Sequence, residues 1–136
     1  MTQSNPTPNI WILSLIGGII AAVLNTVIAL IAPSILGQDI LIPNRSTNIL
    51  EPLPLFAVIA ASLVPAFAAA AVLLGLQKFT KNPIGIFQIT AIILTVLSLF
   101  PLATLNISLG IKIALGLMHI VAAASIVGTL TRPKAA

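Results

Sequence analysis

Four long apolar runs constrain this chain more than any other feature of its sequence. They lie at about residues 10–36, 53–76, 84–102 and 109–130. A helix of roughly 20 apolar residues is long enough to cross a hydrocarbon core about 30 Å thick. Consecutive spans must cross the membrane in opposite directions, so the sequence predicts an all-α fold, an integral membrane bundle of four antiparallel helices.

The composition excludes a soluble domain of this size. Of the 136 residues, 59% are hydrophobic and only 6% are charged, which leaves too little polar surface to face water. The net charge of +4 comes from residues that flank the apolar runs and form no basic stripe. We therefore interpret these charges as topology signals, and we expect the lipid bilayer and no nucleic acid as partner.

The predicted domain organisation is one transmembrane domain with short tails. Residues 10–132 form the domain, residues 1–9 a flexible N-terminal tail and residues 133–136 a C-terminal tail. The tail at 1–9 has no Lys or Arg, and the first apolar run exceeds the roughly 7 to 15 residues of a signal-peptide core. We therefore expect the first run to be a retained membrane helix.

The distribution of Lys and Arg predicts the orientation. With four spans, both termini and the loop at 77–83 share one side, which holds four of these residues, whereas the other side holds only Arg45 and Lys112. Positive residues concentrate on the cytoplasmic side. The sequence thus predicts a multi-pass protein of the plasma (inner) membrane with both termini in the cytoplasm.

Small residues recur every four positions in the first helix. Gly17, Ala21 and Asn25 form one such row, and Gly18, Ala22 and Thr26 form a second. Small side chains allow helix backbones to approach closely in lipid, so this face should point into the bundle.

Polar side chains at the middle of the spans predict a candidate site. His119, the only histidine, lies near the midpoint of the fourth span, and Asn25, Ser62 and Thr95 lie near the midpoints of the others. These four could form a polar layer at the bilayer centre. Ionisable groups there are costly and are candidates for function. The alternatives are a neutral imidazole satisfied by Asn25 or a backbone carbonyl, a ligand or cofactor contact, and proton handling.

Lys112 is the second ionisable residue of the fourth span. At 1.5 Å per residue it lies about 10 Å outward of His119, still within the apolar region, so it must snorkel or pair. Glu51 and Asp39 are the only acids of the chain. We expect an outer ion pair of Lys112 with Glu51, or alternatively with Asp39. Both acids lie in the connection at 37–52, whose residues 40–42 could form a small lid over the bundle.

The sequence lacks the residues that most catalytic and metal sites require. It has no cysteine, one histidine and two acids, so it contains no zinc or iron ligand set and no nucleophile–base pair. We expect no enzymatic activity, no metal and no cofactor.

Three segments resemble a known family. They are Phe79-Thr-Lys-Asn-Pro83, Leu97-Ser-Leu-Phe-Pro-Leu102 and Leu115-Gly-Leu-Met-His-Ile-Val-Ala-Ala-Ala124. Together they are similar to an uncharacterised bacterial family of small four-helix membrane proteins, catalogued as a domain of unknown function, and the Leu-Met-His element is the most specific part. The resemblance implies a bacterial four-span protein. It implies no activity and marks only His119 and its helix as characteristic.

Two functions fit these observations. The leading hypothesis is a non-enzymatic accessory, assembly or structural subunit whose lipid-facing ridges contact another membrane subunit or a second copy. The alternative is a binding or transport module for a lipid, quinone, pigment or small solute. Its polar site would be the midplane group around His119 and Asn25, together with Lys112, under the lid at 37–52.

Overall fold

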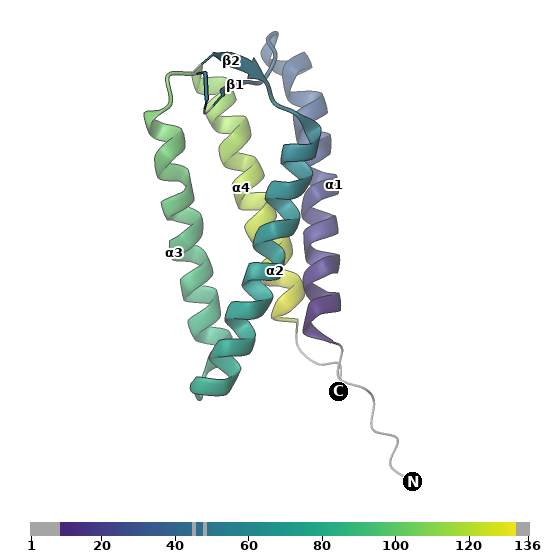
Figure 1. Cartoon of the computed structure of the whole chain (residues 1–136), viewed down its shortest axis with the longest axis vertical. Helices are drawn as coiled ribbons and strands as arrows, with labels where there is room; N and C mark the ends of the chain where they lie inside the picture. Colours follow the sequence, from purple (N-terminus) through teal and green to yellow (C-terminus); the bar gives the residue numbers. More distant parts are fainter. Residues whose placement is uncertain (1–8, 45, 48, 133–136) are drawn as a thin grey trace.

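The computed structural model, which describes residues 9–44, 46–47 and 49–132, contains four long helices and one small hairpin (Figure 1). All four helices are long and apolar enough to cross a membrane. This confirms the predicted all-α class and identifies a multi-pass membrane protein. In chain order the elements are α1 (Ile10–Leu36), β1 (Leu41–Pro43), β2 (Leu50–Pro52), α2 (Leu55–Phe79), α3 (Pro83–Thr104) and α4 (Leu109–Leu130).

The bounds of α1 and α4 coincide with the predicted spans because local caps set them. Asn9 precedes α1, and its side chain accepts a hydrogen bond from the Trp11 amide at 3.0 Å. Gly37 ends α1 with φ of 65°, a conformation that costs glycine little. Ser108 precedes α4, and its hydroxyl accepts a hydrogen bond from the Ile111 amide.

The two middle helices differ from the predicted spans, because α2 is displaced toward the C-terminus and α3 is longer at both ends. Helix α2 begins two residues later than predicted and extends to Phe79, through Gln77 and Lys78. Gln and Lys favour helix, and a lysine in the last turn interacts favourably with the terminal carbonyls, so this polar stretch continues the helix. Helix α3 then starts at Pro83, where proline is tolerated at the first helical position.

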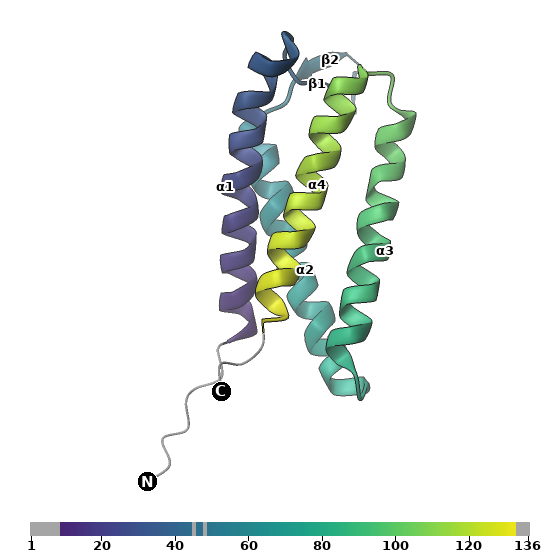
Figure 2. The same ribbon diagram turned by 180° about the vertical axis from the view of Figure 1, so that it is seen from behind.

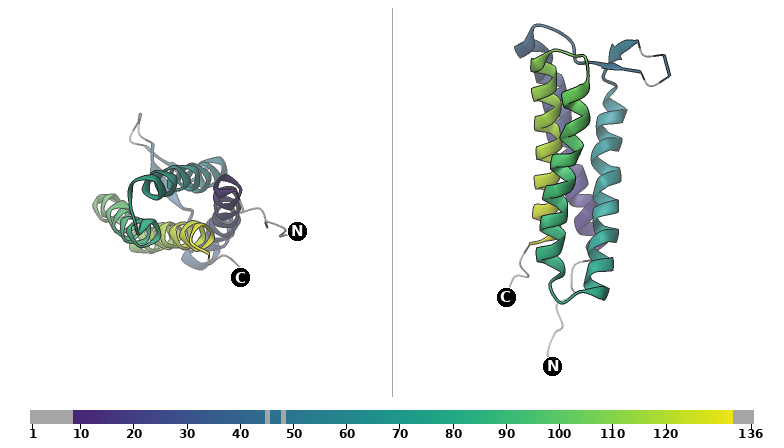
Figure 3. Two further views of the ribbon diagram at one scale, coloured as in Figure 1. Left: turned by 90° about the horizontal axis from the view of Figure 1, so that it is seen from below. Right: turned by 90° about the vertical axis from the view of Figure 1, so that its left-hand side faces the viewer.

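The helices form a bundle in which α3 is the least buried member. Helix α1 packs against α2 and α4, and α3 packs mainly against α4 (Figures 1 and 2). Viewed along the bundle, α3 lies at its edge (Figure 3, left). Only Phe87 of α3 is buried, whereas α1 and α4 each bury seven residues.

The small-residue face of α1 makes the close contacts that the sequence predicts. Gly17 faces α4, where a Cβ on this glycine would lie 3.2 Å from the Ile126 Cα atom. Gly18 faces α2, where its Cβ would lie 3.0 Å from that of Ala66. Ala21, Ala22 and Asn25 are buried on the same side of α1. Two helices therefore approach α1 on adjacent strips of small side chains.

The connection between α1 and α2 contains an antiparallel hairpin that the sequence analysis did not predict. Ile42 lies opposite Glu51 in the β1–β2 pair. Ile40, just before β1, is 4% exposed and joins a cluster with Ile111 and Met118 of α4. The chain leading into β1 thus packs on the end of the bundle opposite to that where α1 begins and α4 finishes, whereas β2 is exposed and the hairpin projects to one side beyond α2 (Figure 3, right). The predicted tail at 133–136, and that at 1–9 apart from Asn9, lie outside the described residues.

Candidate functional site

His119 lies at the middle of α4, and its ring is half-buried. Its Nδ1 atom is 2.8 Å from the carbonyl oxygen of Leu115, one turn earlier in the same helix. A carbonyl oxygen can only accept, so this bond assigns the proton to Nδ1. In the neutral ring, Nε2 then carries a lone pair and acts as an acceptor. Among the described residues, Nε2 has no hydrogen-bond partner. One ring nitrogen of His119 is therefore hydrogen-bonded within its own helix, and the other can accept a hydrogen bond from another molecule.

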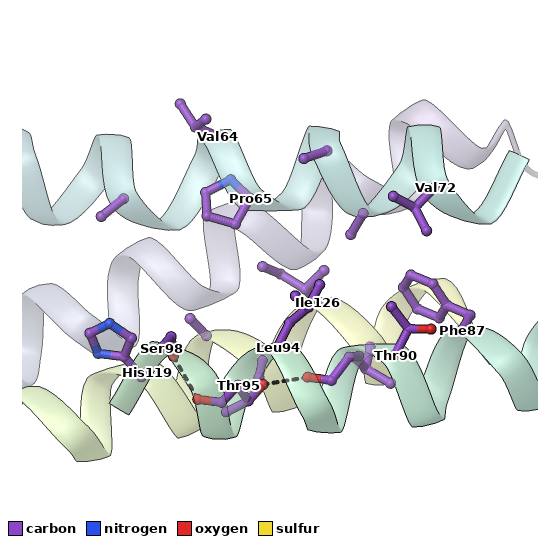
Figure 4. A pocket seen from close by; sticks show the side chains of 17 residues that line it. Val64, Pro65, Val72, Phe87, Thr90, Leu94, Thr95, Ser98, His119 and Ile126 are labelled. Atoms are coloured by element: carbon purple, nitrogen blue, oxygen red, sulfur yellow. Dashed lines mark hydrogen bonds between the residues drawn. The ribbon is translucent and has the colours of Figure 1, made fainter. Parts of the chain in front are cut away.

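A cavity of about 550 Å³ lies beside this histidine, between α2, α3 and α4 (Figure 4). Helix α1 contributes no residue to its wall, and neither does any loop. The wall is mostly apolar, with alanines from all three helices and larger side chains such as Phe87, Val72 and Ile126. Because every lining residue belongs to a membrane-spanning helix, and because α3 packs loosely, the open side of the cavity faces lipid.

Most polar side chains of the cavity lie toward one end, and Thr90 lies at the other beside Phe87 (Figure 4). His119 and Ser98 lie at the first end, with Thr95 one turn along α3 from Ser98 (Figure 4). The Thr95 hydroxyl donates to the Ala91 carbonyl at 2.7 Å. The Ser98 hydroxyl donates to the Thr95 carbonyl, also at 2.7 Å. Both protons are used within α3, so these hydroxyls present lone pairs to the cavity.

Pro65 forms part of the opposite wall, on α2. Proline has no amide hydrogen, so the carbonyl of Ala61, four residues earlier, loses its usual helical donor. Ala61 and Pro65 both line the cavity and both are exposed. The cavity wall therefore includes the residue whose carbonyl lacks this donor. The sequence signal for this wall was the proline itself, because a proline within a helix frees a carbonyl on its own face.

The predicted midplane layer is divided between two interfaces. Asn25 and Ser62 are buried between α1 and α2, where the Asn25 amide donates to the Ser62 hydroxyl at 3.2 Å. Ser62 in turn donates to the Val58 carbonyl at 2.9 Å. Of the predicted partners, only Thr95 shares a cavity with His119. The prediction of a single polar layer is wrong, because residues at similar depths in different helices point in different directions around the bundle.

The predicted ion pair between Lys112 and Glu51 is also wrong. The Lys112 Nζ atom donates to the Ala103 carbonyl oxygen at 2.9 Å, and Glu51 accepts from the Asn44 amide at 3.0 Å. Asp39 and Lys112 both lie in the part of the chain that the structure describes, and they form no ion pair either. The last carbonyls of a helix lack helical donors, and α4 starts directly beside the end of α3. The nearest acceptor for Lys112 is therefore backbone.

The lid and the cavity are separate features. Ile40 and Ile42 pack on a cluster that includes Ile111, Leu115 and Met118, which fills the hairpin end of the bundle. Neither the hairpin nor Lys112 lines the cavity. The predicted arrangement of a lid over a site that joins His119, Asn25 and Lys112 is therefore wrong. The observed cavity shares only His119 with that arrangement, and it includes Thr95 of the predicted midplane layer.

Comparisons with known proteins assign the family. No curated protein and no solved structure matches the chain. Residues 5–136 match a family of unknown function (DUF6069). This match covers nearly the whole chain, in agreement with the resemblance seen in three of its segments. The chain, whose four described helices are long and apolar enough to cross a membrane, belongs to the DUF6069 family of unknown function.

Proposed function

We propose that this protein is a non-enzymatic membrane protein that binds an apolar small molecule taken from the lipid phase. The observation that carries the proposal is the cavity of about 550 Å³ with His119 at one end. A mostly apolar pocket with a few convergent polar groups is the usual form of a small-molecule site. Transport by this route would need a second opening, so binding is the simpler function.

We further propose the inner membrane of a bacterium as its location, with both termini in the cytoplasm. Lys78 and Lys81 lie at the end of the bundle where α1 begins and α4 finishes, and Arg132 lies just after α4. The opposite end has Lys112, whose amino group is held by a backbone carbonyl. The excess of positive charge at the end of the termini supports this orientation.

A plugging experiment tests the binding function. Ala68 on α2 and Ala122 on α4 line the cavity, and phenylalanine at both positions should fill it. Ala60 and Ala71 are exposed on α2 outside the cavity and provide a matched double control. Each protein is purified in a mild detergent, and the small molecules that remain bound are extracted and identified by mass spectrometry.

The expected result is a lipophilic molecule enriched over bulk lipid in the wild type and the control variant. The plugged variant should lose it and keep a normal thermal unfolding curve. If the wild type and the plugged variant retain the same molecules in bulk proportions, the cavity is not a binding site and the proposal is wrong.

The accessory-subunit function remains a second candidate, and one residue favours it. Gln88 carries an amide on the exposed face of α3, within its membrane span. It has no side-chain hydrogen bond to the described residues. An amide in lipid gains from a partner on another helix. If this face binds a subunit, Gln88→Leu should reduce the amount of a co-purifying protein, whereas the plugged variant should not.

A further inference from the structure

We infer that the cavity selects molecules that carry a hydroxyl donor, that is, lipophilic alcohols or phenols, over ethers, ketones and quinones of the same shape. This inference rests on the proposed binding function and specifies its ligand class. The polar end of the cavity presents hydrogen-bond acceptors, and an acceptor-only ligand would leave them unpaired.

His119 is the first acceptor. Its Nδ1 proton is donated to the Leu115 carbonyl at 2.8 Å, which leaves the Nε2 lone pair toward the cavity side. A charged imidazole would instead carry donors on both nitrogens. The two acids that could stabilise that charge, Asp39 and Glu51, lie in the connection at the end of the bundle and do not line the cavity. The acceptor that the ligand hydroxyl needs is the Nε2 atom of the neutral ring.

The remaining polar atoms near His119 are acceptors as well. Thr95 and Ser98 donate their protons to carbonyls of α3, so each keeps only lone pairs. Pro65 supplies no amide to the carbonyl of Ala61 on the wall, and a carbonyl can only accept. Thr90 is the one hydroxyl of the wall without such a bond, and it lies beside Phe87 at the other end (Figure 4). Eight residues of helix, about 12 Å, separate it from Ser98.

The position of these groups orients the ligand. Its hydroxyl lies between His119 and Ser98, near the bilayer centre, and its apolar body extends toward Phe87 and Val72. A hydroxyl near the bilayer centre has no water to which it can donate. An acceptor in the cavity therefore offers it a hydrogen bond that hydrocarbon cannot provide. Isoprenoid alcohols and quinols both have this chemistry.

The test uses matched pairs of probes and the single histidine. Farnesol is compared with its methyl ether, and nonylphenol with nonylanisole, so that each pair differs by the donor and one methyl group. The intact protein is placed in phosphatidylcholine nanodiscs, whose lipids carry no hydroxyl donor. Saturable increases in the unfolding temperature report binding. The ¹⁵N resonances of the lone histidine report a hydrogen bond to Nε2 directly.

We expect each hydroxyl probe to bind about tenfold more tightly than its ether, the effect of one retained hydrogen bond. The Nε2 resonance should move with the hydroxyl probe and stay in place with the ether. In His119→Phe, which keeps a ring but no acceptor, the preference should fall below about twofold. The NMR result on the wild type does not depend on how this variant folds.

The outcomes separate the two proposals. Preference for the hydroxyl in either pair supports the inference, and the pair that shows it names an alcohol or a phenol as the natural class. Equal saturable binding of both members, with no change at Nε2, overturns the inference and leaves the binding function intact. If no probe binds at all, the binding function fails and the inference fails with it.

Discussion

Gly17 packs against the backbone of α4 too closely to accept a side chain, and Gly17→Ala tests this. A Cβ at position 17 would lie 3.2 Å from both the Ile126 Cα atom and the Ser125 carbonyl oxygen, and closer still to the Thr129 hydroxyl. Carbon atoms pack best at about 3.5 to 4.0 Å. Two of these neighbours are backbone of α4, so the helices themselves would have to separate.

The sign of the effect follows from two opposing terms. An extra methyl group in a packed core costs about 1 to 3 kcal/mol. Replacing glycine by alanine within a helix recovers about 0.5 to 1 kcal/mol. The two terms leave a net loss of about 0 to 2.5 kcal/mol, and because two of the contacts are with backbone we expect Gly17→Ala to lower the free energy of unfolding toward the upper part of that range. Gly75 on α2 is the matched control, because a Cβ there meets nothing within 4 Å. Gly75→Ala should raise stability by about 0.5 to 1 kcal/mol.

The assay is unfolding in mixed micelles at increasing mole fractions of dodecyl sulfate. The only tryptophan, Trp11 of α1, stacks on Phe67 of α2 with ring centroids 6.4 Å apart, so its emission reports the separation of these helices. A Gly17→Ala protein as stable as Gly75→Ala would refute the close contact of α1 with α4.

Three further predictions concern polar groups and orientation. Ser62→Ala should lower stability by about 1 to 3 kcal/mol in the same assay, because it leaves the buried amide of Asn25 without its partner. Lys112→Met should cost about 1 kcal/mol or less by thermal unfolding, since it removes one partly solvated bond to a backbone carbonyl, and a larger loss would indicate a missed partner. The chain has no cysteine, so single cysteines can report topology. In intact cells, a membrane-impermeant maleimide should label Ser46→Cys on the hairpin side and should not label Gln77→Cys, and the reverse pattern would invert the proposed orientation.

Depth in the membrane could be predicted from the sequence, because it follows from residue count. The apolar runs gave the four spans, and the positions of His119 and Asn25 near the middle of their helices followed at 1.5 Å per residue. The caps at Asn9, Gly37 and Ser108 are local signals, which is why α1 and α4 have the predicted bounds.

The direction in which each residue points could not be predicted, because these helices are apolar nearly all round. A soluble helix has one polar face that fixes its rotation, whereas a helix in lipid lacks this signal. In α1 the rows of small residues provided a rotational signal in place of a polar face, and the buried face of this helix was predicted correctly. For α3 and α4 no comparable pattern showed whether His119 would face Thr95 on α3 or Asn25 on α1. The partners of His119 therefore required the structure.

The contrast between the two mid-membrane polar sites favours ligand binding over packing as the role of the histidine. Exposed apolar side chains carry little information in a membrane, because lipid covers them as well as a partner would. Polar atoms are informative, since each one unpaired in hydrocarbon is costly. Asn25 donates to Ser62 in a fully buried interface, and although its Oδ1 atom has no partner among the described residues, that atom is enclosed by protein and no cavity reaches it. His119 bonds only within its own helix and keeps a free acceptor beside a cavity. A histidine that served only to join helices would be expected at a closed interface such as that of Asn25, and not at the edge of an open cavity.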